Sequence, residues 1–117
     1  MEWEIEVRVD QIERRSKAAL DRAEVAVVDL IKAIQAAAAA GATDEQLKTA
    51  RALQRKAQWR ADLMNAENSM GFHAPAEFLR ITGEAIDYAR QGEVEVAKLG
   101  KGTSAERGTG SAERKAN

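Results

Sequence analysis

The sequence of 117 residues contains no cysteine, and this absence excludes three kinds of chemistry. A disulfide framework, a thiolate metal site and a Cys-x-x-Cys motif for covalent attachment of c-type haem all require cysteine. Proline and histidine occur once each, as Pro75 and His73, and the aromatic residues are two Trp, one Tyr and two Phe. A lone histidine without cysteine cannot build a zinc site. We therefore expect no catalytic residues and no cofactor bound by this chain alone.

Charge of one sign and long hydrophobic runs are also missing. The 18 basic and 19 acidic side chains leave a net charge of −1, so no segment is basic enough to indicate nucleic acid. No apolar run approaches the roughly 18 residues of a transmembrane helix, and no pattern typical of a signal peptide is visible. We expect no nucleic-acid partner, no membrane span and, for the chain as written, a cytoplasmic location.

The first 40 residues contain two competing patterns. Residues 2–9 alternate apolar and charged side chains, which is typical of a half-buried strand. Apolar residues also recur at helical spacing as far as residue 34. These are Ile5, Val9, Ile12, Ala19, Ala23, Val27, Leu30 and Ile34. Because no Gly or Pro interrupts the chain up to Ala40, we interpret residues 4–40 as one long helix.

A turn and a second helix follow directly. Gly41 supplies the left-handed residue that commonly closes a helix, and Thr43 with Gln46 forms the spacing of a capping box. The apolar positions Leu47, Ala50, Leu53, Ala57, Ala61 and Met64 predict one buried face over residues 44–69. Since the turn is short, the two helices should form an antiparallel hairpin.

A third helix is predicted over residues 75–98, beginning at Pro75. Its apolar positions are Phe78, Leu79, Thr82, Ala85, Ile86 and Ala89. Gly83 within it indicates a close backbone contact. Residues 100–117 are a low-complexity segment that we expect to be disordered, which leaves residues 1–99 as the helical domain. The predicted fold is all-α: a long antiparallel helical hairpin plus a third helix, completed by dimerisation through helix 1 around Val27 and Leu30.

His73 lies in the non-helical joint between the second and third helices. One interpretation is a loop histidine that hydrogen-bonds to a helix end. The other is a neutral imidazole held by a proline-stiffened joint and presented to a metal centre on another polypeptide, because imidazole is a common axial ligand of haem iron. The residues alone leave both open.

Two segments resemble a known family. Ala57-Gln58-Trp59-Arg60-Ala61-Asp62, and His73-Ala74-Pro75-Ala76-Glu77 leading into Leu79-Arg80, are similar to the haem-free C-terminal helices of the ammonia-forming cytochrome c nitrite reductases. The resemblance implies that His73 is the distal axial ligand of one bis-histidine haem and thus binds haem iron. It also implies that Pro75 and Glu77 fix the joint, and that Trp59 and Arg60 are packing positions.

The sequence departs from that family in lacking the haem-attachment motifs, the lysine-ligated catalytic haem, the calcium site and the residues around nitrite. The resemblance therefore implies a non-catalytic C-terminal domain or fragment of an oxidoreductase that converts nitrite to ammonia through haem c. Its partners would be a second copy and the haem-bearing N-terminal part, in the periplasm or another extracytoplasmic space. The alternative is a free-standing helical interaction or dimerisation module without a redox role. An independent enzyme is disfavoured, because no catalytic constellation is visible.

Overall fold

The computed structural model describes the backbone of residues 2–71 and 74–116, and the side chains of residues 8, 10–71 and 74–100. Within those residues the regular structure is three α-helices without a strand: α1 (Glu2–Ala39), α2 (Asp44–Met70) and α3 (Pro75–Ala116). The all-α prediction is confirmed. The alternating segment at residues 2–9 belongs to the start of α1, so the helical interpretation of this segment holds. None of the described helices is long and apolar enough to cross a membrane.

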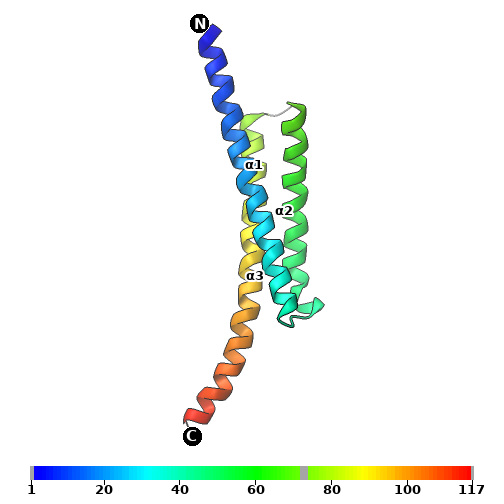
Figure 1. Cartoon of the computed structure of the whole chain (residues 1–117), viewed down its shortest axis with the longest axis vertical. Helices are drawn as coiled ribbons and strands as arrows, with labels where there is room; N and C mark the ends of the chain where they lie inside the picture. The colour runs from blue at the N-terminus through cyan, green and yellow to red at the C-terminus, as the bar shows by residue number, and fades with distance from the viewer. Residues whose placement is uncertain (1, 72–73, 117) are drawn as a thin grey trace.

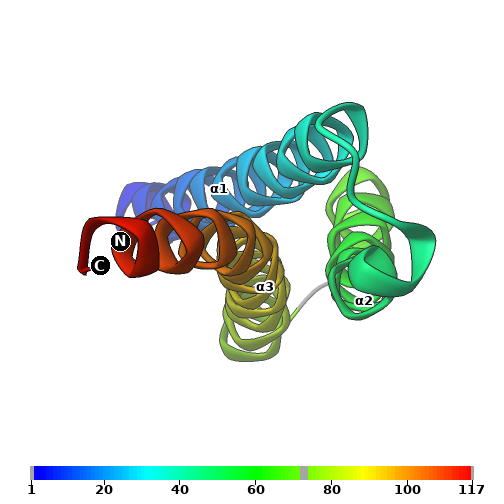
Figure 2. The same ribbon diagram turned by 90° about the horizontal axis from the view of Figure 1, so that it is seen from below.

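The three helices form an elongated bundle that runs up and down along one axis. α1 and α2 are joined at one end and lie antiparallel, and α3 returns from the other end beside both of them (Figure 1). Each helix contacts the other two, and the view along the bundle shows their three-cornered arrangement (Figure 2). The chain measures 79 × 26 × 19 Å. The predicted hairpin plus third helix is thus confirmed, while its completion by dimerisation stays a prediction.

The turn between α1 and α2 follows the chemistry that the sequence predicts. Gly41 has a φ of 107°, in the left-handed region that glycine enters without steric cost. At the start of α2, the hydroxyl oxygen of Thr43 accepts the backbone N–H of Gln46 at 3.2 Å. The Gln46 side-chain oxygen in turn accepts the backbone N–H of Thr43 at 2.9 Å. This reciprocal pair completes the capping box, so α2 begins at Asp44 as expected.

The core runs along the middle of the bundle and is built mainly of small and aliphatic side chains. Its buried members from α1 and α2 include Ala19, Ala23, Ala26, Val27, Leu30, Ile34, Leu47, Ala50, Ala57, Ala61 and Met64. Val27 and Leu30, at 6% and 0% exposure, are covered within the chain itself. They are therefore not available to a second copy, contrary to the expectation that the α1 face around them would form a dimer interface. The reason is that α3 lies beside α1 and covers this face.

α3 differs from its predicted end. The expected helix stops at residue 98 and a disordered segment follows, but the described backbone of α3 is helical as far as Ala116. Proline is absent after Pro75, and Ala, Glu, Arg and Lys, which favour helices, recur in the segment. In Figure 1 this part of α3 continues past the turn between α1 and α2. The division into a domain of residues 1–99 and a separate tail stays a prediction.

The close backbone contact expected at Gly83 occurs at another glycine of α3. A Cβ atom built at Gly83 would meet nothing within 4 Å. A Cβ atom built at Gly92 would lie 2.5 Å from Cδ2 and 2.8 Å from Cδ1 of Leu30, which is fully buried. Gly92 is thus the position where α3 lies against the Leu30 side chain of α1, and a larger residue there would require Leu30 to shift.

Candidate functional site

The joint between α2 and α3 has well-defined ends. Gly71 closes α2 in the left-handed conformation, with φ 73° and ψ 7°, and its N–H donates to the carbonyl oxygen of Asn68 at 3.2 Å. α3 begins at Pro75, whose missing N–H costs nothing in a first turn. The N–H of Phe78 donates to the carbonyl oxygen of Ala74 at 2.9 Å, which is the first hydrogen bond of α3. The end of α2 and the start of α3 are therefore only a few residues apart.

His73, the residue that sequence analysis identified as the haem ligand, lies outside the described residues, as does Phe72. The structure describes the flanking residues Gly71 and Ala74 and thus shows which helix ends hold the joint. His73's role as an axial ligand stays a prediction.

A chain of ion pairs connects the two segments that carry the resemblance. Arg80 donates two hydrogen bonds to Glu77, one from Nε to Oε2 at 3.2 Å and one from Nη2 to Oε1. Nη1 of Arg80 donates to Oε1 of Glu84 at 2.6 Å. The other oxygen of Glu84 accepts from Nε of Arg60, on α2, at 3.2 Å. Glu84 therefore bridges the start of α3 to the middle of α2, which limits sliding of the helices that carry the joint.

Arg60 is held on more than one side. Its guanidinium carbon lies 4.6 Å from the ring centroid of Tyr88, within the range of a cation–π contact. Its Nη1 also donates to the carbonyl oxygen of Lys56 at 3.1 Å. The Nζ of Lys56 lies 5.6 Å from the same Tyr88 ring. Arg60 is thus a packing position between α2 and α3, in agreement with the role that the resemblance implied.

Apolar side chains support the joint from inside the bundle. Leu20 of α1, Met64 of α2 and Phe78 of α3 form a buried cluster separate from the larger core. Thr82 is buried beside it at 1% exposure, and its hydroxyl oxygen lies 3.0 Å from the carbonyl oxygen of Phe78. A buried hydroxyl needs a hydrogen-bond partner, and the backbone of its own helix supplies one here. All three helices therefore contribute a side chain to this buried cluster.

The ion pairs shift the ionisation of the two outer residues. The hydrogen bonds from Arg80 lower the pKa of Glu77 below its ordinary value of 4.5, because they favour the carboxylate over the protonated acid. The same bonds to Glu77 raise the pKa of Arg80. Glu77 remains solvent-exposed, so the shift reflects pairing and not burial. At neutral pH the pair is fully ionised.

Two expected core residues are on the surface. Leu79, predicted to lie on the buried face of α3, is 41% exposed. Trp59 is 63% exposed, so it is not a core residue, although sequence analysis expected a packing role. The guanidinium of Arg60 is 5.9 Å from its ring, at the outer limit of a cation–π contact. Trp59 thus presents most of its ring to the solvent.

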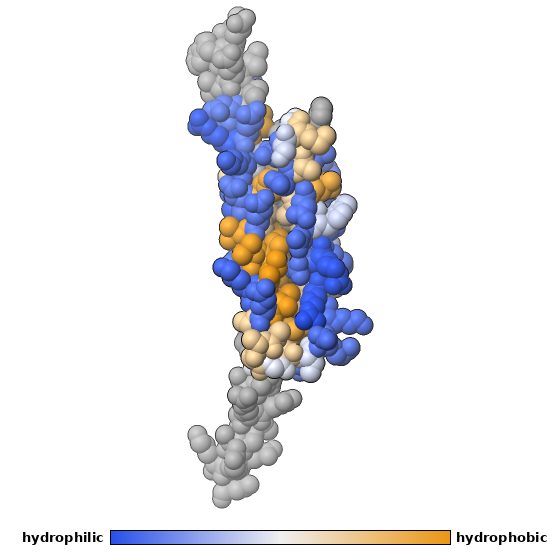
Figure 3. All heavy atoms as spheres, turned by 45° about the vertical axis from the view of Figure 1, so that its right-hand side comes forward, coloured by the Kyte–Doolittle hydropathy of each residue, from blue (hydrophilic) through white to orange (hydrophobic). Residues whose placement is uncertain are grey.

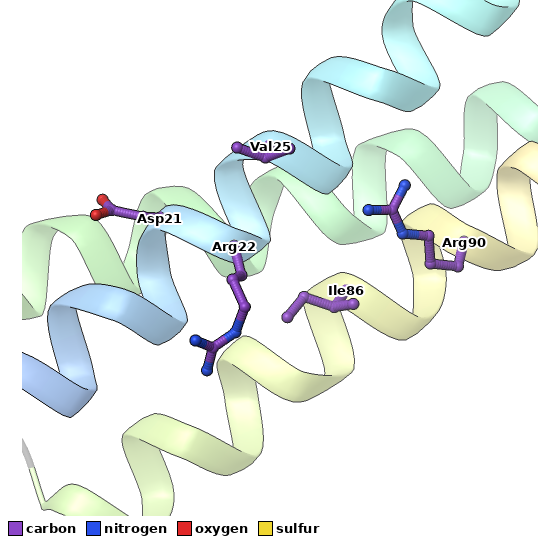
Figure 4. Close-up of a pocket in the computed structure, with 5 residues that line it drawn as sticks. All are labelled: Asp21, Arg22, Val25, Ile86 and Arg90. Atoms are coloured by element: carbon purple, nitrogen blue, oxygen red, sulfur yellow. The ribbon is translucent and has the colours of Figure 1, made fainter.

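A second feature is a groove along α1 and its border with α3. One section, of about 450 Å³, lies on α1 and is lined by Val25 and Val28 and by four charged residues, Asp21, Glu24, Asp29 and Lys32. The adjoining section of about 290 Å³ lies between Val25 of α1 and Ile86 of α3, with Arg90 at its edge (Figure 4). Figure 3 shows apolar side chains along the middle of one face, bordered by hydrophilic ones. Val25 and Val28 are 56% and 45% exposed.

The donor set limits what the site can hold. The part of the chain whose side chains are described has no group of three or more His, Cys, Asp or Glu residues that could hold a metal ion. Without cysteine, the chain cannot attach haem covalently. The sequence does contain one imidazole, that of His73, a side chain of the kind that binds haem iron as an axial ligand.

Glu84 and Tyr88, which connect Arg60 to α3, were not among the residues predicted from the sequence. A signal for Glu84 was available, because Glu77, Arg80 and Glu84 follow one another at spacings of three and four residues on a predicted helix. The link from Glu84 to Arg60 could not be read in the same way, because it spans 24 residues and depends on how α2 and α3 pack.

Comparison with known proteins identifies one family. The family described as cytochrome c552 matches residues 2–115 of this chain. The proteins named cytochrome c-552 from Bacteroides thetaiotaomicron and Parabacteroides distasonis are each 44% identical over 59 residues. That alignment covers 50% of this chain but only 12% of either relative. No solved structure matches the chain.

These findings correct one expectation. Sequence analysis identified the chain with the C-terminal part of an ammonia-forming nitrite reductase. The family that matches is cytochrome c552, and neither its description nor the names of the relatives specify nitrite reduction or a C-terminal fragment. The assignment is therefore corrected to the cytochrome c552 family, which indicates c-type haem electron transfer.

Proposed function

Because the chain belongs to the cytochrome c552 family, we propose that it is a helical domain that joins a haem-bearing polypeptide and supplies His73 as one axial ligand. The observation that supports this most is the chemistry of the chain: its only histidine occupies the joint, and it has no cysteine with which to hold haem itself. The haem would supply electron transfer. This chain would position the imidazole.

The described residues around the joint suit such a role. An axial ligand must be presented at a constant position and angle, because loose ligands weaken coordination and leave the potential poorly defined. The cap at Gly71 and the helix start at Pro75 set the ends of the joint. The bridge from Glu84 to Arg60 holds α2 and α3 at one relative height. These contacts would keep the imidazole in place before it meets the iron.

The test uses a chimaera in which this chain replaces the segment that it matches in the Bacteroides thetaiotaomicron cytochrome c-552. We expect His73→Ala to change the absorption spectrum and potential of one low-spin haem, and added imidazole to restore the spectrum. Ser69→Ala, at an exposed position in the last turn of α2, is the matched control and should leave every haem unchanged. A full set of unaltered haems in His73→Ala would refute the role of His73.

For the assembled protein we propose reduction of nitrite to ammonia, at haems outside this chain and in an extracytoplasmic space. The support is membership of the cytochrome c552 family, because c-type haems can pass electrons to a small substrate. The chimaera, given nitrite and a reduced dye, should form ammonia. Consumption of the dye with neither nitrite loss nor ammonia would contradict this reaction while leaving haem ligation by His73 intact.

The second candidate function is a helical dimerisation module without a redox role. The groove beside Val25 and Val28 favours it, because exposed apolar residues lining a hollow are typical of protein interfaces. In this proposal a second copy covers the groove. The two functions are compatible, since the groove lies between α1 and α3 whereas the joint links α2 to α3.

A further inference from the structure

Four apolar residues form a continuous stripe along α2, which we call the α2 stripe: Trp59, Leu63, Ala66 and Met70. Their spacings of four, three and four residues place them on one side of the helix. Trp59, Leu63 and Met70 are 63%, 37% and 66% exposed, and Ala66 is exposed as well. At 1.5 Å per residue, the stripe extends for about 17 Å along the helix.

The α2 stripe is separate from the core of the bundle. α2 buries another set of residues against its neighbours, including Ala57, Ala61 and Met64. A tryptophan, a leucine and a methionine repeated along the outer side of the same helix gain nothing from contact with water. Tryptophan and methionine are enriched at protein interfaces, and tryptophan frequently contributes most of the binding energy there. The stripe thus has the composition of an interface.

A hollow next to the stripe adds shape to this surface. It has a volume of about 210 Å³ and lies between Leu63 on α2, Ala74 in the joint, and Phe78 and Ile81 on α3, with acidic residues at its edge. That volume is several times the roughly 30 Å³ that one water molecule occupies in the liquid. The hollow can therefore accept an apolar side chain from a partner.

The direction of the stripe indicates which partner. Met70 is the last residue of α2, so the stripe ends where the joint with His73 begins. A polypeptide that brings a haem iron to the joint would come close to this end of α2. The relatives have ample further sequence that could supply such a polypeptide, since the matched segment is only 12% of either one. The exposed apolar residues Val25 and Val28 are on α1 and do not lead to the joint.

We propose that the α2 stripe and its adjoining hollow are the surface on which the haem-bearing polypeptide of a c-type cytochrome docks. This inference rests on the proposed function and adds the contact surface. Burial of the apolar stripe and insertion of a side chain into the hollow hold the two parts together. Docking places the joint against the haem.

Hydroxyl-radical footprinting of the complete chain and of the chimaera tests the surface directly. Trp59 and Met70 react readily in the free chain because both are largely exposed. We expect the oxidation rates of both to fall about tenfold in the chimaera, as for side chains at an interface core. Val25 and Val28 on α1 serve as internal controls for the other apolar surface and should stay as reactive as in the free chain.

A variant pair tests the same surface through affinity. The probe is the Bacteroides thetaiotaomicron cytochrome c-552 produced without the segment that this chain matches. Leu63→Gln with Met70→Gln should weaken binding of the chain to this probe about tenfold or more, since these are proposed anchors. Val25→Gln with Val28→Gln, an equally exposed apolar pair on α1, should leave the affinity unchanged. Melting temperatures equal to that of the original chain would show that both pairs preserve the fold.

The outcomes separate this inference from the proposed function. If the His73-dependent haem spectrum is present but Trp59 and Met70 stay as reactive as in the free chain, the docking surface is refuted and haem ligation stands. If the α1 pair weakens binding and the α2 pair does not, the partner occupies the groove and this inference fails. If neither protection nor a His73-dependent haem is found, both proposals fail.

Discussion

At the scale of single residues, Gly92 is packed directly against the core of the bundle. A methyl group there would collide with the fully buried side chain of Leu30. We expect Gly92→Ala to lower the free energy of unfolding by about 1–3 kcal/mol, because overpacking a core forces side chains and backbone to move. Urea unfolding monitored by circular dichroism measures the difference.

Gly83→Ala is the matched control, on the same helix but exposed and with free space around it. Here the substitution should raise the free energy of unfolding by about 0.5–1 kcal/mol, because alanine has the higher helix propensity. Equal effects at the two glycines would contradict the close approach of α3 to α1 at Gly92.

Thr43 is the N-cap residue of α2, and its contribution to stability can be measured by itself. Thr43→Ala removes the hydroxyl that accepts the N–H of Gln46, so one donor at the start of α2 loses its partner. The expected loss of stability is about 0.5–2 kcal/mol, measured by thermal unfolding. Thr49→Ala, also exposed but inside α2, removes the same atoms without a cap. If Thr43→Ala and Thr49→Ala changed the stability by the same amount, the capping box would not stabilise α2.

At the scale of secondary-structure elements, the bridge from Glu84 to Arg60 connects α2 to α3. Glu84→Gln should lower the free energy of unfolding by up to about 1 kcal/mol, as is usual for partly exposed ion pairs. Glu95→Gln is the control, because it breaks only the pair with Lys98 within α3. We expect a double-mutant cycle with Arg60→Gln to show coupling for Glu84 and none for Glu95. Coupling of equal size for both would refute the bridge.

The pair of Glu77 and Arg80 makes the start of α3 sensitive to acid. The pKa of Glu77 is lower in the folded chain than its ordinary value of 4.5, so its carboxylate stabilises the fold fully above that pH. This contribution is lost as the pH falls through the lowered pKa of the folded state. The melting temperatures of the original chain and Glu77→Gln should therefore differ at neutral pH and converge in acid. A difference that grows in acid would contradict this sign.

At the scale of the whole molecule, the groove between α1 and α3 should support self-association. Val28→Glu replaces one of its two exposed valines with a charge, so sedimentation velocity should show a shift from dimer to monomer. Val27→Glu would not test the interface, because Val27 is buried and its substitution would unfold the bundle. Lys32→Glu reverses a charge that is already present in the groove and leaves both valines intact. It should therefore shift the monomer–dimer equilibrium less than Val28→Glu does. A single monomeric species at tens of micromolar for the original chain would contradict dimerisation.

The three helices and most of their starts and turns follow from the sequence by itself. Helix spacing in α1, the capping box at Thr43 and the single proline at Pro75 are local signals. They determine where the backbone is helical and where a helix begins. The absence of cysteine, likewise, excludes covalent haem without any structure. His73 was identified from the sequence, since a lone histidine beside a lone proline needs no fold to be noticed.

The tertiary structure alone decided which helix surfaces meet and which remain free. It placed Gly92, and not Gly83, against Leu30, and it left Trp59 in solvent, because both outcomes depend on the relative rotation of helices distant in sequence. The bridge from Glu84 to Arg60 has the same origin. Periodicity specifies that a helix has an apolar side, but a helix such as α2 can have two. Packing against α1 and α3 decides which side becomes core and which stays on the surface.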